Sequence, residues 1–217
     1  MSDPGRAGAD IGALEPRELV ALLDRMDPAD IAAMDIDVDA IGRAVDPRQL
    51  GRDDLSLLLG AINRLAEAGA GVDLSGLAPP TFARIIAHAS REQVEAIMGQ
   101  PRLRAAVLTE IFRRMGSHLR EDRVVGLHAV IHWRLTGGTG EGGYDRYEAV
   151  IAEGACVVGR EMAQRPRVTI TLSPVDFCKL VTHNASAPVL FMTGKLKVRG
   201  DLAFAAGLTG LFELPHP

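Results

Sequence analysis

Two histidines have the spacing for metal chemistry. His128 and His132 stand four positions apart in a segment whose apolar residues alternate, so both imidazoles lie on one face of a predicted strand, opposite Trp133. A zinc site needs at least three protein ligands, and no third ligand stands near these two in the sequence. We therefore expect both to be solvent-facing residues of a sheet.

Three aspartates resemble the start of a calcium loop. Asp35, Asp37 and Asp39 alternate with apolar residues, but Ala40 stands where such a loop requires glycine. A solvated turn with an aspartate as helix N-cap explains the same pattern. The sequence therefore predicts no metal site and no cofactor.

The serines, cysteines and glycine-rich stretch of this sequence lack the motifs that surround nucleophiles and phosphate-binding loops. Ser173 and Ser186 stand in no nucleophile elbow. Cys156 and Cys178 have neither metal spacing nor a legible histidine partner, and we expect two small buried residues. The stretch Gly137–Gly143 lacks the Lys-Ser/Thr of a phosphate loop and opens no helix, so we interpret it as a hairpin loop. We predict that the protein is not an enzyme.

A row of cations follows in the C-terminal part of the chain. Lys195, Lys197 and Arg199 alternate along a predicted strand and share its outer face. These cations suit the phosphates of phospholipids or of acyl-CoA, and they equally suit a solvated strand face that blocks aggregation. The sequence leaves both interpretations open.

Composition excludes several classes of protein. The formal net charge is −4; residues 1–55 carry 13 acidic against 6 basic residues, and residues 56–120 carry 5 against 8. Nucleic-acid binding would require a basic domain or stripe, and tight binding to anionic membranes a polybasic cluster. No apolar run is long enough to span a bilayer, and residues 1–9 do not resemble a signal peptide. We predict a cytoplasmic protein with no nucleic-acid partner and at most transient membrane contact.

The N-terminal half has a helical pattern of apolar residues up to Leu119. An apolar residue followed two positions later by proline occurs at Leu14, Val45 and Leu77, which suggests a repeat of about 31 residues. Ser90 and Gln93 have the spacing of a capping box at a helix start. We predict a disordered tail over residues 1–12 and an all-α domain of short helical hairpins over residues 13–100.

The C-terminal half, residues 101–217, is predicted to form an α+β domain. Pro101 opens a long helix, whose apolar stripe consists of Leu103, Val107, Leu108, Ile111, Phe112 and Met115. After Asp122 the apolar period changes to two. Five predicted strands cover residues 124–135, 147–151, 156–159, 168–172 and 195–199, with helices over 173–181 and 201–212. Short links between the first three strands favour antiparallel pairing. We expect a five-stranded, mostly antiparallel sheet covered by helices.

Two segments of this domain resemble a known family. Residues 168–177 read Val-Thr-Ile-Thr-Leu-Ser-Pro-Val-Asp-Phe, and residues 191–201 read Phe-Met-Thr-Gly-Lys-Leu-Lys-Val-Arg-Gly-Asp. They are similar to the hallmark segments of the sterol carrier protein 2 family, and the resemblance extends over about residues 101–213. The abundance of Arg over Lys suggests a bacterial member, and the helical residues 13–100 would be an extra N-terminal domain. One departure is Val181–Asn184, where the family has glycine after the helix; Asn is the next best residue for a left-handed C-terminal position.

The resemblance implies a hydrophobic tunnel between sheet and helices that binds fatty acyl chains, acyl-CoA or sterols, and a role in lipid transfer. We predict that its lining consists of Ile131, Trp133, Ile170, Phe177, Leu180, Phe191, Met192, Leu196, Phe204, Leu208, Leu211 and Phe212. The same residues would also form a filled core, and sequence does not separate the two.

Two alternatives to a lipid carrier stay open. In the first, the protein is a scaffold whose N-terminal helices form a homodimer or bind a partner protein, and whose C-terminal core is filled. In the second, it is a non-catalytic accessory of a lipid or natural-product enzyme.

Overall fold

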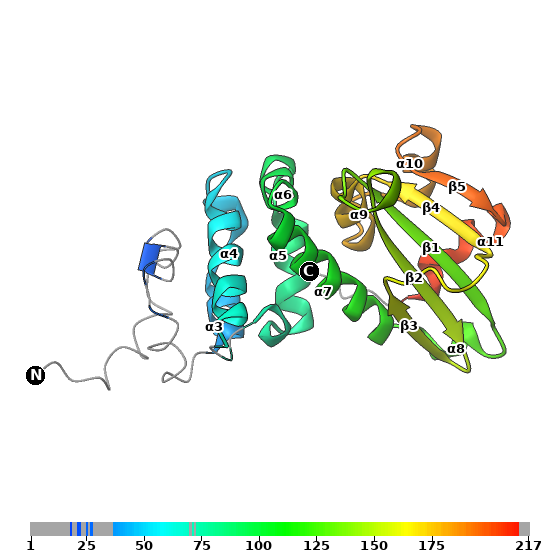
Figure 1. Ribbon diagram of the computed structural model, residues 1–217, viewed down its shortest axis with the longest axis horizontal. Helices are drawn as coiled ribbons and strands as arrows, with labels where there is room; N and C mark the ends of the chain where they lie inside the picture. Colours follow the sequence, from blue (N-terminus) through cyan, green and yellow to red (C-terminus); the bar gives the residue numbers. More distant parts are fainter. Residues whose placement is uncertain are drawn as a thin grey trace, which may run out of the picture. The chain divides into compact units, whose positions relative to one another are not determined.

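The computed structural model of the protein describes residues 37–69, 71 and 73–212, together with five isolated positions between residues 18 and 27. The chain divides into two compact units, one up to Glu110 and one from Ile111 to His216 (Figure 1). The predicted tail over residues 1–12 and the first copy of the repeat, at Leu14, lie outside the described residues. Among the described helices, none has the length and apolar character needed to cross a membrane.

The first unit is built from short helices with identifiable caps. Helix α3 (Val38–Ala44) begins at Asp37, whose carboxylate accepts a hydrogen bond from the backbone N–H of Ala40 at 2.9 Å. It packs against α5 (Pro79–His88), while α4 (Asp54–Glu67) packs against α6 (Arg91–Met98). The pattern of apolar residues therefore predicted the helical character of this unit correctly.

The described copies of the repeat differ in structure. Pro79 opens the ten-residue helix α5, whereas Pro47 opens the three-residue 3₁₀ turn η3 (Pro47–Gln49). The capping box at the start of α6 is confirmed: Ser90 Oγ accepts from the N–H of Gln93, and Gln93 Oε1 accepts from the N–H of Ser90. The Gln93 amide also donates to the carbonyl of Pro47 at 2.8 Å, which joins α6 to η3.

Helix α7 (Pro101–Ser117) begins in the first unit and ends in the second. All six residues of its predicted apolar stripe are 6% exposed or less: Leu103, Val107, Leu108, Ile111, Phe112 and Met115. A 3₁₀ turn, η4 (Leu74–Gly76), connects α4 to α5. A short helix, α8 (Glu121–Val124), follows α7.

The second unit contains a five-stranded mixed sheet in the order β3-β2-β1-β4-β5. Its strands are β1 (Ala129–Thr136), β2 (Tyr144–Ala152), β3 (Ala155–Gly159), β4 (Val168–Leu172) and β5 (Lys197–Gly200). The β1–β2, β2–β3 and β4–β5 pairs are antiparallel, and β1–β4 is parallel. The predicted fold class, helices followed by a mostly antiparallel five-stranded sheet with helices, is confirmed.

The remaining elements of this unit connect and cover the strands. The turn η5 (Glu141–Gly143) lies in the β1–β2 hairpin, as expected for the glycine-rich stretch. Helices α9 (Pro174–Val181) and α10 (Ala187–Met192) lie between β4 and β5 in the chain, and α11 (Leu202–Gly207) and η6 (Leu208–Leu211) follow β5.

Several details of the sequence prediction were wrong; β5, for example, begins at Lys197 rather than Lys195. Strand β1 begins at Ala129 rather than Val124, because Glu121 and Asp122 suit the first turn of α8 and Gly126 turns the chain at φ +69°. Two helices, not one, lie between β4 and β5, since a second helix with Pro188 in its first turn begins at Ala187, after the turn that ends α9. The left-handed residue after α9 is His183, at φ +60°, rather than Asn184.

Candidate functional site

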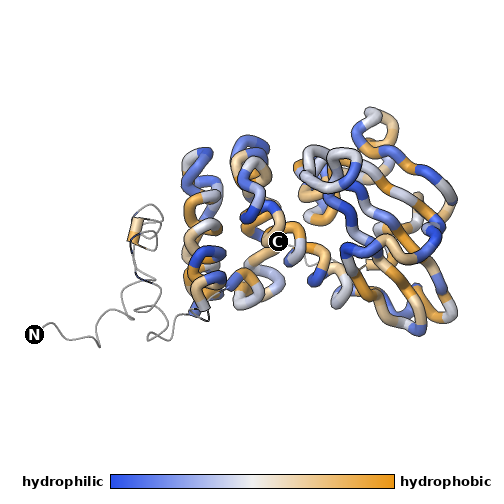
Figure 2. Tube along the Cα trace, in the orientation of Figure 1, coloured by the Kyte–Doolittle hydropathy of each residue, from blue (hydrophilic) through white to orange (hydrophobic). Residues whose placement is uncertain are grey.

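The strands of the sheet place apolar side chains on one face, which we call the inner face. Alternation along β1 puts Ile131, Trp133 and Leu135 there, and each is 3% exposed or less. Trp133 is paired with Tyr147 of β2 and with Ile170 of β4, so these side chains share that face. Figure 2 shows hydrophobic and hydrophilic residues alternating along the strands. The inner face is therefore the apolar surface predicted from the period of two.

An aromatic cluster covers the middle of the inner face. Phe112 of α7 stacks on Tyr147 with 3.9 Å between ring centroids and on Phe177 of α9 with 4.9 Å. Trp133 meets Phe112 and Phe177 edge to face, at 6.1 and 5.5 Å. Phe112 and Tyr147 were missing from the predicted lining, although Phe112 was already assigned to the apolar stripe of its helix.

The predicted lining residues fall into three groups by exposure. Eight are buried at 6% exposed or less: Ile131, Trp133, Ile170, Phe177, Leu180, Leu196, Leu208 and Phe212. Phe204 and Leu211 are half-buried. Phe191 and Met192 lie on the surface, 49% and 78% exposed. The structure thus gathers most of the predicted set in the interior and leaves two at the end of α10 exposed.

Helix α10 exposes an apolar surface to solvent. Val189, Phe191 and Met192 are each at least 49% exposed, although the exposure of large apolar side chains to water is unfavourable. Lys195 and Lys197 follow directly and are exposed as well. This apolar segment with neighbouring cations has the composition that suits contact with a lipid surface.

The other face of the sheet, which we call the outer face, carries a buried polar pair. His132 Nε2 donates to Glu148 Oε2 at 2.9 Å, and the two side chains are 9% and 7% exposed. The backbone N–H of Gln164 donates to the same carboxylate oxygen at 2.9 Å. The expectation that His132 faces solvent was therefore wrong, because the connection between β3 and β4 covers it. His128 is exposed, as expected.

The pKa of Glu148 reflects these contacts. Burial by itself would raise the pKa of the carboxyl above its ordinary value of 4.5, but the hydrogen bonds from Gln164 and His132 outweigh burial and lower it. Glu148 is thus held as a carboxylate, an acceptor for its two donors. Sequence reasoning missed this residue because the register that places it opposite His132 depends on the length of the hairpin.

Both cysteines are free thiols, and the prediction that both are buried holds for Cys178 but not for Cys156. Cys178 is buried and Cys156 is partly exposed. Burial raises the pKa of the Cys178 thiol to about 12 and that of Cys156 to about 11. Both thiols therefore stay protonated at neutral pH, which makes them weak nucleophiles.

The aspartates that resemble a calcium loop have structural roles where they are described. Asp37 caps α3, as predicted, and Asp39 accepts a hydrogen bond from the backbone N–H of Ala78 at 2.8 Å. Asp35 lies outside the described residues. Within the described part of the chain, no three His, Cys, Asp or Glu side chains gather as a metal site would require.

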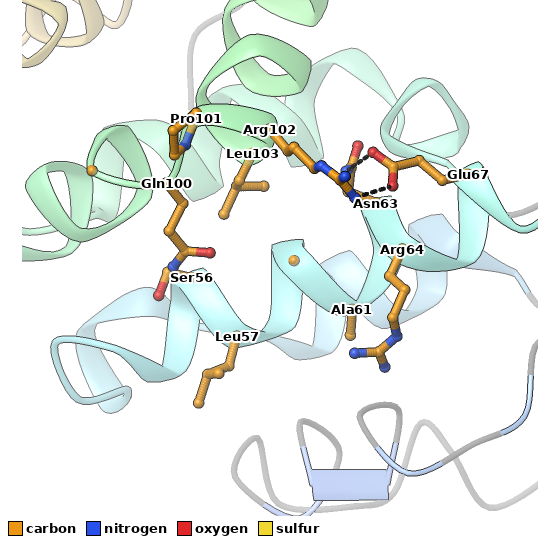
Figure 3. Close-up of a pocket in the computed structure, with 12 residues that line it drawn as sticks. Ser56, Leu57, Ala61, Asn63, Arg64, Glu67, Gln100, Pro101, Arg102 and Leu103 are labelled. Carbon is orange, nitrogen blue, oxygen red and sulfur yellow. Dashed lines mark hydrogen bonds and ion pairs between the residues drawn. The ribbon is translucent and has the colours of Figure 1, made fainter. Parts of the chain in front are cut away.

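An open groove of about 680 Å³ lies in the first unit, between α4 and the turn that joins α6 to α7 (Figure 3). Its walls carry both charged and apolar groups: Arg102 forms an ion pair with Glu67 at 3.5 Å, and Leu57 is 49% exposed. Asn63 donates to the same Glu67 carboxylate at 3.1 Å. Sequence reasoning did not predict this groove.

Curated proteins similar to this chain match about half of it or less. Hydroxysteroid dehydrogenase-like protein 2 from Homo sapiens is 28% identical over 119 residues, which cover 55% of this chain and 28% of the human protein. A fatty acid-binding protein from Yarrowia lipolytica is 46% identical over 46 residues, 21% of this chain and 36% of that protein. The chain spans about a quarter of the length of the dehydrogenase-like relatives it matches.

Solved structures align with this chain at low sequence identity. Sterol carrier protein 2 from Yarrowia lipolytica in its apo form aligns with a TM-score of 0.40 at 24% identity, covering 50% of this chain and 88% of that one. The sec-alkylsulfatase Pisa1 from Pseudomonas sp. aligns with a TM-score of 0.42 at 17% identity, covering 95% of this chain and 28% of the sulfatase. In a comparison with protein families, residues 108–213 match the SCP-2 sterol transfer family.

Proposed function

We propose, from the SCP-2 sterol transfer family domain that the C-terminal half carries, that the protein binds and transfers an apolar lipid: a fatty acyl chain, an acyl-CoA or a sterol. The observation that carries the proposal is the inner face, where the strand side chains and Phe112 and Phe177 of the helices are apolar and buried. Burial of a lipid chain against such a surface contributes about 0.8 kcal/mol per methylene. Affinity then needs few polar contacts.

The exposed end of α10 supports a further part of the proposal. Phe191 and Met192 would enter the interfacial region of a bilayer while Lys195 stays at the level of the headgroups. One short helix gives weak, reversible attachment, as a carrier that must leave the membrane requires. We place no catalytic step in the domain, so the lipid leaves unchanged, and we place the protein in the cytoplasm.

A substitution at Leu208 tests whether the inner face receives a ligand. Leu208 of η6 is 3% exposed, and tryptophan in its place adds a large ring to the interior. If lipid occupies space beside it, Leu208→Trp abolishes displacement of a fluorescent fatty acid and leaves the melting temperature of the unliganded protein nearly unchanged. The control is Leu202→Trp on α11, which is 57% exposed and should leave both measurements unaltered.

The second candidate function is a scaffold with a filled core. The close stacking of Phe112 on Tyr147 and Phe177 favours it, because stacked rings occupy the space that a tunnel would need. In a filled core, Leu208→Trp would overpack the interior and cost about 1–3 kcal/mol of stability. Loss of stability without any wild-type binding of fatty acid would therefore decide for the scaffold.

A further inference from the structure

The indole of Trp133 is buried without a hydrogen-bond partner. The side chain is 3% exposed, and Nε1 meets no acceptor. An indole N–H is a donor only, and buried tryptophans usually find an acceptor for it. On folding, this group gives up its hydrogen bond to water and receives none in return.

Two other buried side-chain nitrogens in the described part of the chain lack hydrogen-bond partners, and each differs from Trp133. Arg146 leaves Nε unpaired but binds Glu141 through Nη1 at 2.8 Å. His88 Nδ1 lies 3.8 Å from a carboxylate oxygen of Asp46. Trp133 has a single polar atom, so its unpaired nitrogen leaves the whole side chain without a polar contact.

The neighbours of the indole define which acceptor would suit it. Phe112 and Phe177 meet it edge to face, and Ile170 is its partner in β4. The hydroxyl of Tyr147, its partner in β2, accepts instead from Arg160 Nη2 at 2.6 Å. Phe112, Phe177 and Ile170 carry no charge, and an ionised carboxylate placed among them would lose far more hydration than one hydrogen bond restores. A neutral oxygen would not carry that cost.

We propose that Trp133 Nε1–H donates to a neutral oxygen of the bound lipid, a hydroxyl or an ester or thioester carbonyl, and thereby fixes how the lipid is oriented on the inner face. The inference rests on the proposed lipid binding and adds a polar position to it. It implies a preference for sterols, fatty alcohols or esterified acyl chains over free fatty acids and plain hydrocarbons.

Two fluorescent probes separate this inference from lipid binding in general. 1-Pyrenedecanol and 1-decylpyrene share chain and fluorophore and differ by one hydroxyl. The full-length wild type is expected to bind the alcohol about fivefold more tightly, the value of one net neutral hydrogen bond. Trp133→Phe keeps an aromatic ring and removes the donor, so it should bind both probes alike, with the affinity for decylpyrene changed less than twofold.

The control variant is Tyr144→Phe, which removes a hydroxyl from the start of β2 on the outer face and should keep the preference. A preference that survives in Trp133→Phe, or equal weakening of both probes, would overturn the inference while leaving lipid binding intact. Wild-type protein that binds neither probe would overturn both.

A spectroscopic measurement needs no variant. The sequence contains one tryptophan, so the ¹⁵N-labelled protein gives a single indole N–H resonance. Pyrenedecanol should move its proton downfield, as a new hydrogen bond does, and decylpyrene should not. Equal shifts with both probes, or a resonance already downfield without ligand and unchanged by either, would show that the lipid oxygen is not the acceptor.

Discussion

His132 and Glu148 are the polar residues most deeply placed on the outer face of the sheet. Their hydrogen bond, together with that from the N–H of Gln164, ties the connection between β3 and β4 onto β1 and β2. A buried carboxylate with two donors is stabilising only while it is ionised. The pair therefore couples the attachment of this connection to pH.

Replacing the carboxylate tests that coupling. The pKa of Glu148 is lowered in the folded protein, so its contribution to stability is present above its ordinary value of 4.5 and is lost as the pH falls through the lowered value. Glu148→Gln should reduce the free energy of unfolding at pH 7 by about 1–3 kcal/mol. Urea unfolding at pH 7 and pH 3.5 should also show a smaller loss on acidification than in the wild type.

The matched control for this prediction is Glu141→Gln. Glu141 pairs with Arg146 at 2.8 Å, but its side chain is 86% exposed, and exposed pairs contribute little. The control should follow the wild type at both pH values. An unchanged acid sensitivity in Glu148→Gln would mean that this carboxylate does not hold the connection.

Sequence patterns predicted the position of a single residue only where one local rule determines it. Alternation placed Ile131, Trp133 and Ile170 on a buried face, because each strand has a period of two whatever its partners are. It could not show that His132 meets Glu148, since that contact depends on the register of two strands and on a loop that covers them. It also could not show that the Trp133 indole would lack an acceptor.

At the scale of elements, the turn between β5 and α11 gives a structural reason for the end of the hallmark segment 191–201. Gly200 has φ +107°, and a Cβ atom there would lie 2.4 Å from the carbonyl oxygen of Arg167. The next residue, Asp201, caps α11 through the N–H of Phe204 at 2.8 Å and pairs with Arg167 at 2.8 Å. The Gly-Asp dipeptide thus lets β5 pass close to the start of β4 and begins the last helix.

Gly200→Ala should therefore destabilise the protein by about 2–3 kcal/mol, because it combines a disfavoured φ with a backbone clash. The measurement is the free energy of unfolding in urea. Gly207→Ala, at φ −88° with nothing within 4 Å of the added methyl, should be neutral or stabilising by up to about 1 kcal/mol. Equal effects of the two substitutions would refute the role given to Gly200.

Element boundaries were less accessible to sequence than element types. The predicted period of two extended upstream into residues 124–128, where α8 ends and a turn follows instead. The acidic first turn of α8 and a glycine at positive φ override this short alternation. The prediction placed Phe191 and Met192, at the end of α10, in the tunnel lining. Sequence could not show that they are exposed, because exposure depends on how a short helix is placed after its turn. The helix α7 was predicted correctly because its apolar stripe continues over several turns.

At the scale of the whole molecule, the two units differ in the features that indicate a function. The C-terminal unit has a family match and an apolar inner face. In the N-terminal unit the structure adds the groove between α4 and the α6–α7 turn. A homodimer or a protein partner bound through these helices stays a prediction.

The central claim is that the protein holds an apolar lipid. Native mass spectrometry of the purified full chain tests it most directly, because a buried lipid should survive purification and transfer to the gas phase. We predict a folded population that carries adducts with the masses of acyl lipids or sterols, which added fluorescent fatty acid displaces at micromolar protein. A single population at the mass of the bare chain that binds no added lipid would contradict the account.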